Sequence, residues 1–144
     1  MRNVFYMIFS KNTILKKIKQ NLIKITDFNL SSLEEASYDL KLGSCFDKIK
    51  QTWDPISFHG LQIEPGSFVL AKTQEKITLS PKIACMIFTT SSLAKQGVDV
   101  IQSSSFCHPQ TNNEITLEIV NHNSQPIIIK QRQNVAKAIF MEVI

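Results

Sequence analysis

Short β-rich runs separated by turn-forming residues fill most of the chain after residue 35, and this succession constrains the fold more than any other feature. The runs cover residues 37–42, 67–71, 75–79, 83–88, 98–101, 115–120, 126–130 and 135–143. Between them lie turn signals at Gly43, Asp54-Pro55, Gly60, Pro65-Gly66, Ser80-Pro81, Gly97 and residues 108–113 and 121–124. Short strands at close spacing, with no helical pattern between them, favour an all-β sandwich or barrel over alternating β-α units.

One amphipathic helix is predicted, near the N-terminus. Apolar residues recur at helical spacing across residues 11–22, lysines occupy the other face, and Ser10 is a candidate N-cap. Residues 23–35 mix short apolar pairs with polar residues, which is typical of a short strand or a loop. The predicted fold class is therefore mainly β with one N-terminal helix.

Length and composition limit the chain further. With 144 residues, 43% of them hydrophobic, we expect residues 1–144 to form a single domain around one core. The formal charge of +4 is scattered, so it fits a small anionic ligand at least as well as a nucleic acid strand. No apolar run approaches the roughly 20 residues of a membrane-spanning helix.

Targeting and cysteine patterns favour a cytoplasmic protein. The apolar run at residues 4–9 is too short for a signal peptide, and lysines follow it without a cleavage site. Cys45, Cys85 and Cys107 are odd in number and form no C-x-x-C pair, which indicates reduced thiols. The three histidines are widely spaced, and Cys107-His108 are adjacent, so no zinc site is predicted.

Residues 89–113 are rich in Ser, Thr, Asn and Gln, and Lys95 and Asp99 carry their only formal charges. Residues 89–92 follow the apolar run at 83–88 directly. Their hydroxyl and backbone N–H groups could receive phosphate oxygens where a buried strand emerges. The same composition is typical of a solvated loop, and composition alone favours that interpretation.

Glu118 is a candidate acid/base residue. Residues 115–120 alternate so that Thr116 and Glu118 share one strand face, while Ile115, Leu117 and Ile119 share the other. A carboxylate among apolar neighbours tends to have a raised pKa and can then exchange a proton near neutral pH. An ordinary outward-facing Glu gives the same pattern, and periodicity does not choose between the two. The sequence is equally ambiguous for His108, which can be interpreted as a site residue or as an exposed loop histidine.

Four segments resemble motifs of one enzyme family, in the same order along the chain. Residues 37–43, SYDLKLG, are similar to "SYDLRLG", and residues 63–71, IEPGSFVLA, to "PGEFVLA". Residues 91–95 with Gly97 resemble "RSSLARxG", and residues 115–118 resemble "ITLEL". Residues 7–10 and the helix after them resemble the family's opening segment. Over nearly its whole length the chain thus resembles a dCTP deaminase of the dUTPase and dCTP deaminase superfamily.

This resemblance implies a distorted β-barrel or jelly-roll-like subunit, assembled as a homotrimer with nucleotide sites at the subunit interfaces. It implies hydrolysis of dCTP to dUTP and ammonia without zinc or another cofactor for the chemistry. Glu118 would be the general acid/base, and Ser91 and Lys95 would help to position water and base. The remaining implied substrate contacts are Thr90, Ser92 at the phosphates, Ser104 through its carbonyl, His108 and Thr116.

The implied partners are a deoxycytidine nucleotide and further copies of the chain, with no nucleic acid polymer and no membrane. Mg²⁺ would accompany the triphosphate and would not activate the water.

The chain departs from the family pattern at several positions. Thr90 stands where the motif has Arg, so we expect weaker triphosphate binding. His108 replaces an Asp, Gln110 replaces a turn Gly, and residues 131–137 replace "PGMRIAQ". The printed sequence ends at Ile144, where family members continue into a tail that closes over the nucleotide, so we also expect weaker closure.

Two functional hypotheses therefore stay open. One is a dCTP deaminase, or a relative acting on another deoxycytidine nucleotide. The other is a catalytically silent trimeric homologue that serves as a binding or regulatory module. A dUTP pyrophosphatase is disfavoured because His108 lies where an acidic residue would be expected.

Overall fold

The computed structural model describes residues 7–144, so the predictions for residues 1–6 lie outside it. Its elements are α1 (Lys11–Lys19), β1 (Ile23–Ile25), a 3-10 turn (Leu30–Ser32), β2 (Tyr38–Asp47), β3 (Thr52–Pro55), β4 (Leu61–Ile63), β5 (Phe68–Leu79), β6 (Ile83–Thr89), α2 (Ser91–Lys95), β7 (Val98–Asp99), β8 (Phe106–Cys107), β9 (Asn112–Asn121), β10 (Ile127–Ile129) and β11 (Asn134–Glu142).

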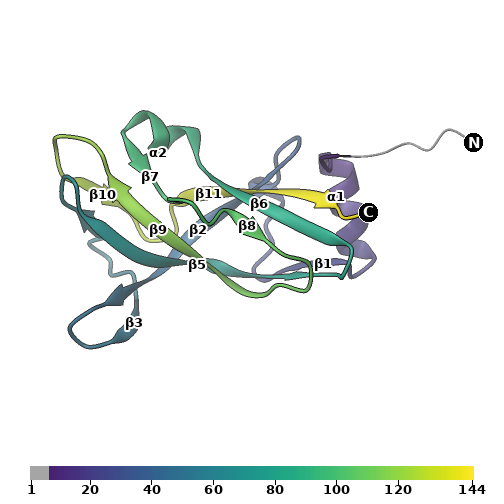
Figure 1. The fold of residues 1–144 in the computed structure, drawn as a ribbon, viewed down its shortest axis with the longest axis horizontal. Coiled ribbons are helices and arrows are strands. Elements are labelled where there is room, and N and C mark those ends of the chain that lie inside the picture. The colour runs from purple at the N-terminus through teal and green to yellow at the C-terminus, as the bar shows by residue number, and fades with distance from the viewer. Residues whose placement is uncertain (1–6) are drawn as a thin grey trace, which may run out of the picture.

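The strands form one large antiparallel sheet that curls into a half-barrel (Figure 1). Its order is β7-β9-β5-β2-β11-β6-β8, with β1 beside β5 and β3 beside β2, while β4 and β10 form a separate pair. The inward faces of the strands enclose one continuous apolar core, to which α1 contributes the fully buried Ile14. The predicted mainly β, distorted-barrel class is confirmed.

Strand β2 joins the two halves of the curled sheet. Its first half pairs with β11, and its second half pairs with β5 and β3. The β2–β5 register shifts between Leu42 and Ser44, and Gly43 lies at this bulge. A Cβ on Gly43 would lie 2.7 Å from the backbone N and Cα of Gln74, closer than side-chain atoms approach backbone. The close pairing of β2 with β5 at this bulge therefore requires glycine at this position.

Strand β9 has the alternation that the sequence predicts. Ile115, Leu117 and Ile119 are buried in the core, Thr116 is exposed and Glu118 is half-buried. The two candidate site residues of this strand thus share its outer face, and the apolar face holds the strand in the sheet.

The predicted helix is confirmed with a shorter C-terminal end. The Ser10 hydroxyl accepts a 3.3 Å hydrogen bond from the Thr13 N–H, as an N-cap should. The helix ends at Lys19 rather than residue 22, and Asn21 then takes a left-handed φ of 58°.

Other predicted elements differ from the structure. The runs at 67–71 and 75–79 belong to one strand, β5. Its register with β9 shifts between Lys72 and Lys76, but the strand continues through this irregularity. The short strands β3, β4 and β8 were not predicted. The short helix α2, directly after β6, was not predicted either. Helices and strands this short carry too few residues to show a period.

Gly43→Ala is expected to lower the free energy of unfolding by about 1–3 kcal/mol, because the new methyl group overlaps backbone atoms that have little room to move. Chemical denaturation of both proteins measures the difference. Ser44→Ala, at the neighbouring position, is the control and should change stability by less than about 0.5 kcal/mol. Equal stabilities of Gly43→Ala and the unsubstituted protein would contradict the close approach.

Candidate functional site

A polar cavity of about 610 Å³ lies between the start of α2 and the edges of β2 and β11. Its wall carries hydroxyl, amide and charged groups, contributed by Glu34, Ser37, Asp39, Thr90, Ser91, Ser92, Gln133, Asn134 and Lys137. Groups of this kind form directional hydrogen bonds, so the cavity suits a polar ligand. We refer to it below as the polar cavity.

Thr90 fixes the position of α2 in this wall. Its N–H donates a 3.2 Å hydrogen bond to the carbonyl of Val135 on β11, and its own carbonyl accepts the first helical bond from Ala94 at 3.0 Å. The Thr90 side chain is buried, and its Oγ1 has no hydrogen-bond partner among the described residues. A buried hydroxyl without a partner is uncommon in folded proteins.

The charges of the polar cavity are mixed. Asp39 on β2 lies directly opposite Lys137 on β11 in the antiparallel ladder. Burial is the largest effect on the Asp39 carboxyl and raises its pKa; the charge of Glu34 raises it further, while Lys137 and Lys41 lower it. Two carboxyl groups and one ammonium group therefore share the wall with the serines.

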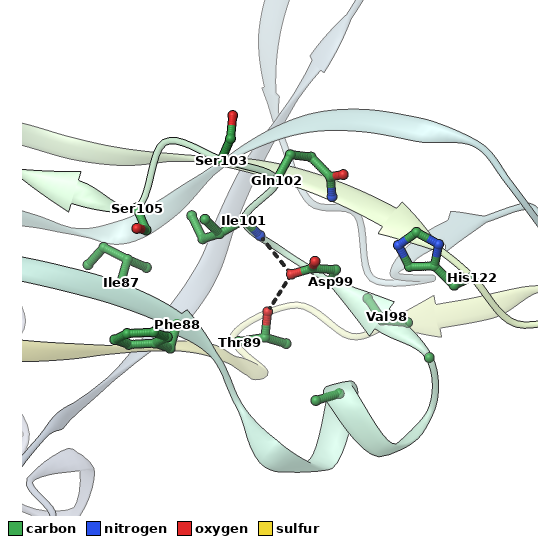
Figure 2. Close-up of a pocket in the computed structure, with 12 residues that line it drawn as sticks. Ile87, Phe88, Thr89, Val98, Asp99, Ile101, Gln102, Ser103, Ser105 and His122 are labelled. Atoms are coloured by element: carbon green, nitrogen blue, oxygen red, sulfur yellow. Dashed lines mark hydrogen bonds between the residues drawn. The ribbon is translucent and has the colours of Figure 1, made fainter.

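A second cavity, of about 630 Å³, lies between the end of β6 and residues 97–105 (Figure 2). Thr89 and Asp99 meet on its wall, where the Thr89 hydroxyl donates to Asp99 Oδ1 at 3.0 Å. The same Oδ1 accepts a 3.3 Å bond from the Ile101 N–H, and Thr89 Oγ1 accepts a 3.0 Å bond from the Val100 N–H. These bonds fix the backbone that enters residues 101–105.

Glu118 is tied to the same segment through its backbone. Its N–H donates to the Val100 carbonyl at 2.9 Å, and its carbonyl accepts a 3.3 Å bond from Gln102 Nε2. Ser104 is exposed and lies two residues beyond Gln102. The strand that carries Glu118 and the segment that carries Ser104 are therefore fastened together.

The predicted site residues fall into separate groups within one chain. Thr90, Ser91 and Ser92 line the polar cavity, and Lys95 is exposed in the last turn of α2. Glu118 and Thr116 face outward on β9 and line neither cavity. His108 is exposed just after β8, where its ring packs edge-on against Phe106 with centroids 4.8 Å apart.

Several polar residues around these groups were missed by sequence reasoning. Asp39 and Lys137 lie inside segments that were compared with family motifs, but only the tertiary structure pairs them across β2 and β11. Asp99 and Gln102 carry no local signal beyond polarity, because their partners are Thr89 and the Glu118 carbonyl.

Metal-binding groups are sparse in the described part of the chain. Within residues 7–144, no three His, Cys, Asp or Glu side chains gather in a way that would hold a metal ion. Mg²⁺ bound to a nucleotide needs only one or two carboxylates in addition to phosphate oxygens, and Asp39 and Glu34 in the polar cavity fit that requirement. No helix within the same residues has the length and apolar character to cross a membrane.

Comparison with known proteins gives consistent similarities. A family model described as dCTP deaminase-like matches residues 8–143. A curated relative, "dCTP deaminase, dUMP-forming" from Hydrogenobaculum sp. (strain Y04AAS1), is 30% identical over 148 aligned residues, covering 95% of this chain and 83% of the relative.

Solved structures share the fold. The 2'-deoxycytidine 5'-triphosphate deaminase from Agrobacterium tumefaciens superposes with a TM-score of 0.75 at 17% identity, covering 95% of this chain and 48% of that one. The native EIAV dUTPase superposes with a TM-score of 0.53 at 19% identity, covering 72% of this chain and 88% of that one.

Thr89→Val is expected to lower the free energy of unfolding by about 1–3 kcal/mol and to speed amide hydrogen exchange at Val100. The substitution keeps the shape of the side chain but leaves the Val100 N–H without its acceptor and removes one of the two hydrogen bonds that Asp99 Oδ1 accepts. Ser103→Ala, on the wall of the same cavity, is the control and should leave exchange at Val100 unchanged. Equal exchange in the Thr89 variant and the unsubstituted protein would contradict the bonding described.

Proposed function

The chain belongs to the dCTP deaminase-like family, and on that premise we propose that it catalyses the hydrolytic deamination of a deoxycytidine nucleotide. With dCTP, water adds its oxygen to cytosine C4, the bond from C4 to N4 breaks, and dUTP and ammonia leave. The observation that carries the proposal is the half-buried Glu118, whose backbone is hydrogen-bonded to the segment leading to Ser104.

Glu118 acts as the general acid/base of the reaction. Its carboxylate takes a proton from the attacking water and returns a proton to N4, so that ammonia rather than an amide anion departs. The two hydrogen bonds between the Glu118 backbone and residues 100–102 hold the 101–105 segment next to β9 at Glu118. The Ser104 carbonyl can then accept a hydrogen bond from the same water. Preorganised groups of this kind lower the barrier because they need no rearrangement during the reaction.

The nucleotide is held by the remaining predicted residues. Ser91 and Lys95 position the water and the base, and Ser92 with Thr90 contacts the phosphates in the polar cavity. His108 and Thr116 contact other parts of the substrate. Mg²⁺ enters with the triphosphate, and Asp39 and Glu34 are the cavity carboxylates available to it or to its water ligands. The proton transfers themselves are carried by Glu118.

The active protein is a homotrimer in this proposal, with each site completed by two copies. One chain does not place Glu118 in the cavity that Ser91 and Ser92 line. Beyond Lys137, the outer face of β6, β8 and β11 carries exposed and half-buried apolar side chains, and we call this part the apolar face. Its members are Met86, Phe88, Phe106, Ile139 and Met141. Phe88 and Phe106 are 42% and 44% exposed, and contiguous apolar surface of this kind is typical of an interface.

A second candidate reaction is favoured by the similarity to the Hydrogenobaculum relative, a dUMP-forming dCTP deaminase. In that reaction the deaminated nucleotide stays bound, and a second water cleaves dUTP to dUMP and pyrophosphate. Separation of the products by chromatography distinguishes the two: deamination alone leaves dUTP, whereas the two-step reaction leaves dUMP and pyrophosphate. A catalytically silent trimer would bind nucleotide and release no ammonia.

Glu118→Gln is expected to lower the rate of ammonia release from dCTP by about 10²–10⁴-fold, because an amide does not accept and return a proton as a carboxylate does. An ammonia assay on the purified protein measures the rate. Glu114→Gln, an exposed position on the same strand, is the control and should keep its activity. Turnover that survives in the Glu118 variant would exclude Glu118 as the acid/base, and absence of turnover in the unsubstituted protein would favour the silent homologue.

Phe88→Asp is expected to shift the protein from a mass of three chains to lower oligomers, because it puts a charge into the apolar face at the proposed interface. Light scattering coupled to size-exclusion chromatography measures the mass. Phe58→Asp is the control, since Phe58 is 94% exposed in the loop after β3 and is not part of the apolar face. A monomeric unsubstituted protein, or a trimer unaffected by Phe88→Asp, would contradict this use of the apolar face.

A further inference from the structure

The polar cavity contains a single cation among the described residues that line it. Its hydroxyl and amide groups are neutral, and Glu34 and Asp39 bring negative charge. Lys137 supplies the only positive side chain. A phosphate chain that enters this cavity therefore meets two carboxyl groups and one ammonium group, so its binding depends strongly on that ammonium group.

The backbone holds Lys137 beside the first turn of α2. On β11 it lies between Asp39 of β2 and Phe88 of β6 in the ladder. Two residues earlier, the Val135 carbonyl accepts the Thr90 N–H at 3.2 Å. This bond joins β11 to the start of α2, where Ser91 and Ser92 lie. The Lys137 side chain and the two serine hydroxyls thus belong to one rigid wall.

The ammonium group of Lys137 forms no salt bridge with the carboxylate of Asp39 in the described chain. The two residues are nevertheless directly paired in the ladder. The pKa of Asp39 also stays above its ordinary value, since burial outweighs the stabilising charge of Lys137. The three N–H donors of the ammonium group are therefore available to a ligand.

The neighbouring Thr90 contributes a hydrogen bond without charge. Its buried Oγ1 has no partner in the described chain, and Thr90 belongs to the same wall. A hydroxyl group can orient a phosphate oxygen, but it does not offset the charge of a triphosphate.

From these contacts we propose that Lys137 is the residue that binds the phosphate chain of the nucleotide through its positive charge. The inference rests on the proposed function for the identity of the ligand, and it adds a binding residue that the motif comparison did not assign. In this inference, Lys137 is the residue that gives the protein a higher affinity for a nucleotide than for the uncharged nucleoside.

Lys137→Gln is expected to raise the dissociation constant for dCTP about 10- to 100-fold, the range of a lost hydrogen bond to a charged group. Binding of deoxycytidine, which has no phosphate, should change less than about twofold, because only the charge on the phosphate chain distinguishes the ligands. Calorimetric titration of the full chain with dCTP, deoxycytidine and inorganic tripolyphosphate measures binding without requiring turnover. Tripolyphosphate should lose affinity as dCTP does.

Matched variants separate a charge effect from damage to the fold. Lys130→Gln removes an exposed lysine from the turn before β11, outside the polar cavity, and should leave all three affinities unchanged. Lys137→Arg keeps the charge and should bind dCTP within a few-fold of the unsubstituted protein. Adding Thr90→Arg to Lys137→Gln places a cation elsewhere in the same wall and should recover part of the lost dCTP affinity.

The outcomes distinguish this inference from the proposed function. If the unsubstituted protein deaminates dCTP and Lys137→Gln binds dCTP with unchanged affinity, the role of Lys137 is wrong and the function stands. If dCTP binding depends on Lys137 but no ammonia is released, the proposed reaction is wrong and the role of Lys137 stands. If neither dCTP nor tripolyphosphate binds the unsubstituted protein, both proposals fail.

Discussion

The close backbone contact at Gly43 is the constraint on which the arrangement of the site depends. Because Gly43 has no side chain, the backbone of β2 can approach the backbone of Gln74 on β5 closely. This close approach lets β2 continue from one half of the curled sheet into the other. On one side of this contact, β2 places Asp39 opposite Lys137 of β11. On the other side, β2 pairs with β5, and β5 pairs with the strand that carries Glu118. One strand therefore sets both the wall of the polar cavity and the position of Glu118, for which we propose the acid/base role.

The chemistry that we propose has two steps with different electrostatic requirements, proton transfer and nucleotide binding, and different parts of the site serve them. Proton transfer requires a carboxylate held next to the attacking water, and the hydrogen bonds of Glu118 to residues 100–102 provide a rigid surrounding for it. Binding of the nucleotide requires positive charge and hydrogen-bond donors, which Lys137, Ser91 and Ser92 provide in the polar cavity. Because one chain keeps these parts separate, assembly of several chains becomes part of how such a site would be completed.

Two turn residues take a backbone conformation that their side chains disfavour. Gln110 and Arg132 stand where the related motifs have glycine, and both take left-handed φ values, 68° and 60°. A side chain in this conformation costs roughly 1–2 kcal/mol, so the turn geometry is kept against the preference of the residue. The residue differs from glycine at each place, and the backbone still takes the conformation that glycine would allow.

The sequence by itself determined the fold class, the alternation of β9 that turns Glu118 outward, the cap at Ser10 and the resemblance that the family comparison confirms. These features depend on neighbours along the chain or on short motifs, and a linear pattern records both. Only the tertiary structure decided that α2 is a helix, that Asp39 faces Lys137, and that Gln102 fastens the 101–105 segment to Glu118. Residues far apart in the chain create these contacts, and their strengths depend on burial and distance, which no periodicity in the sequence encodes.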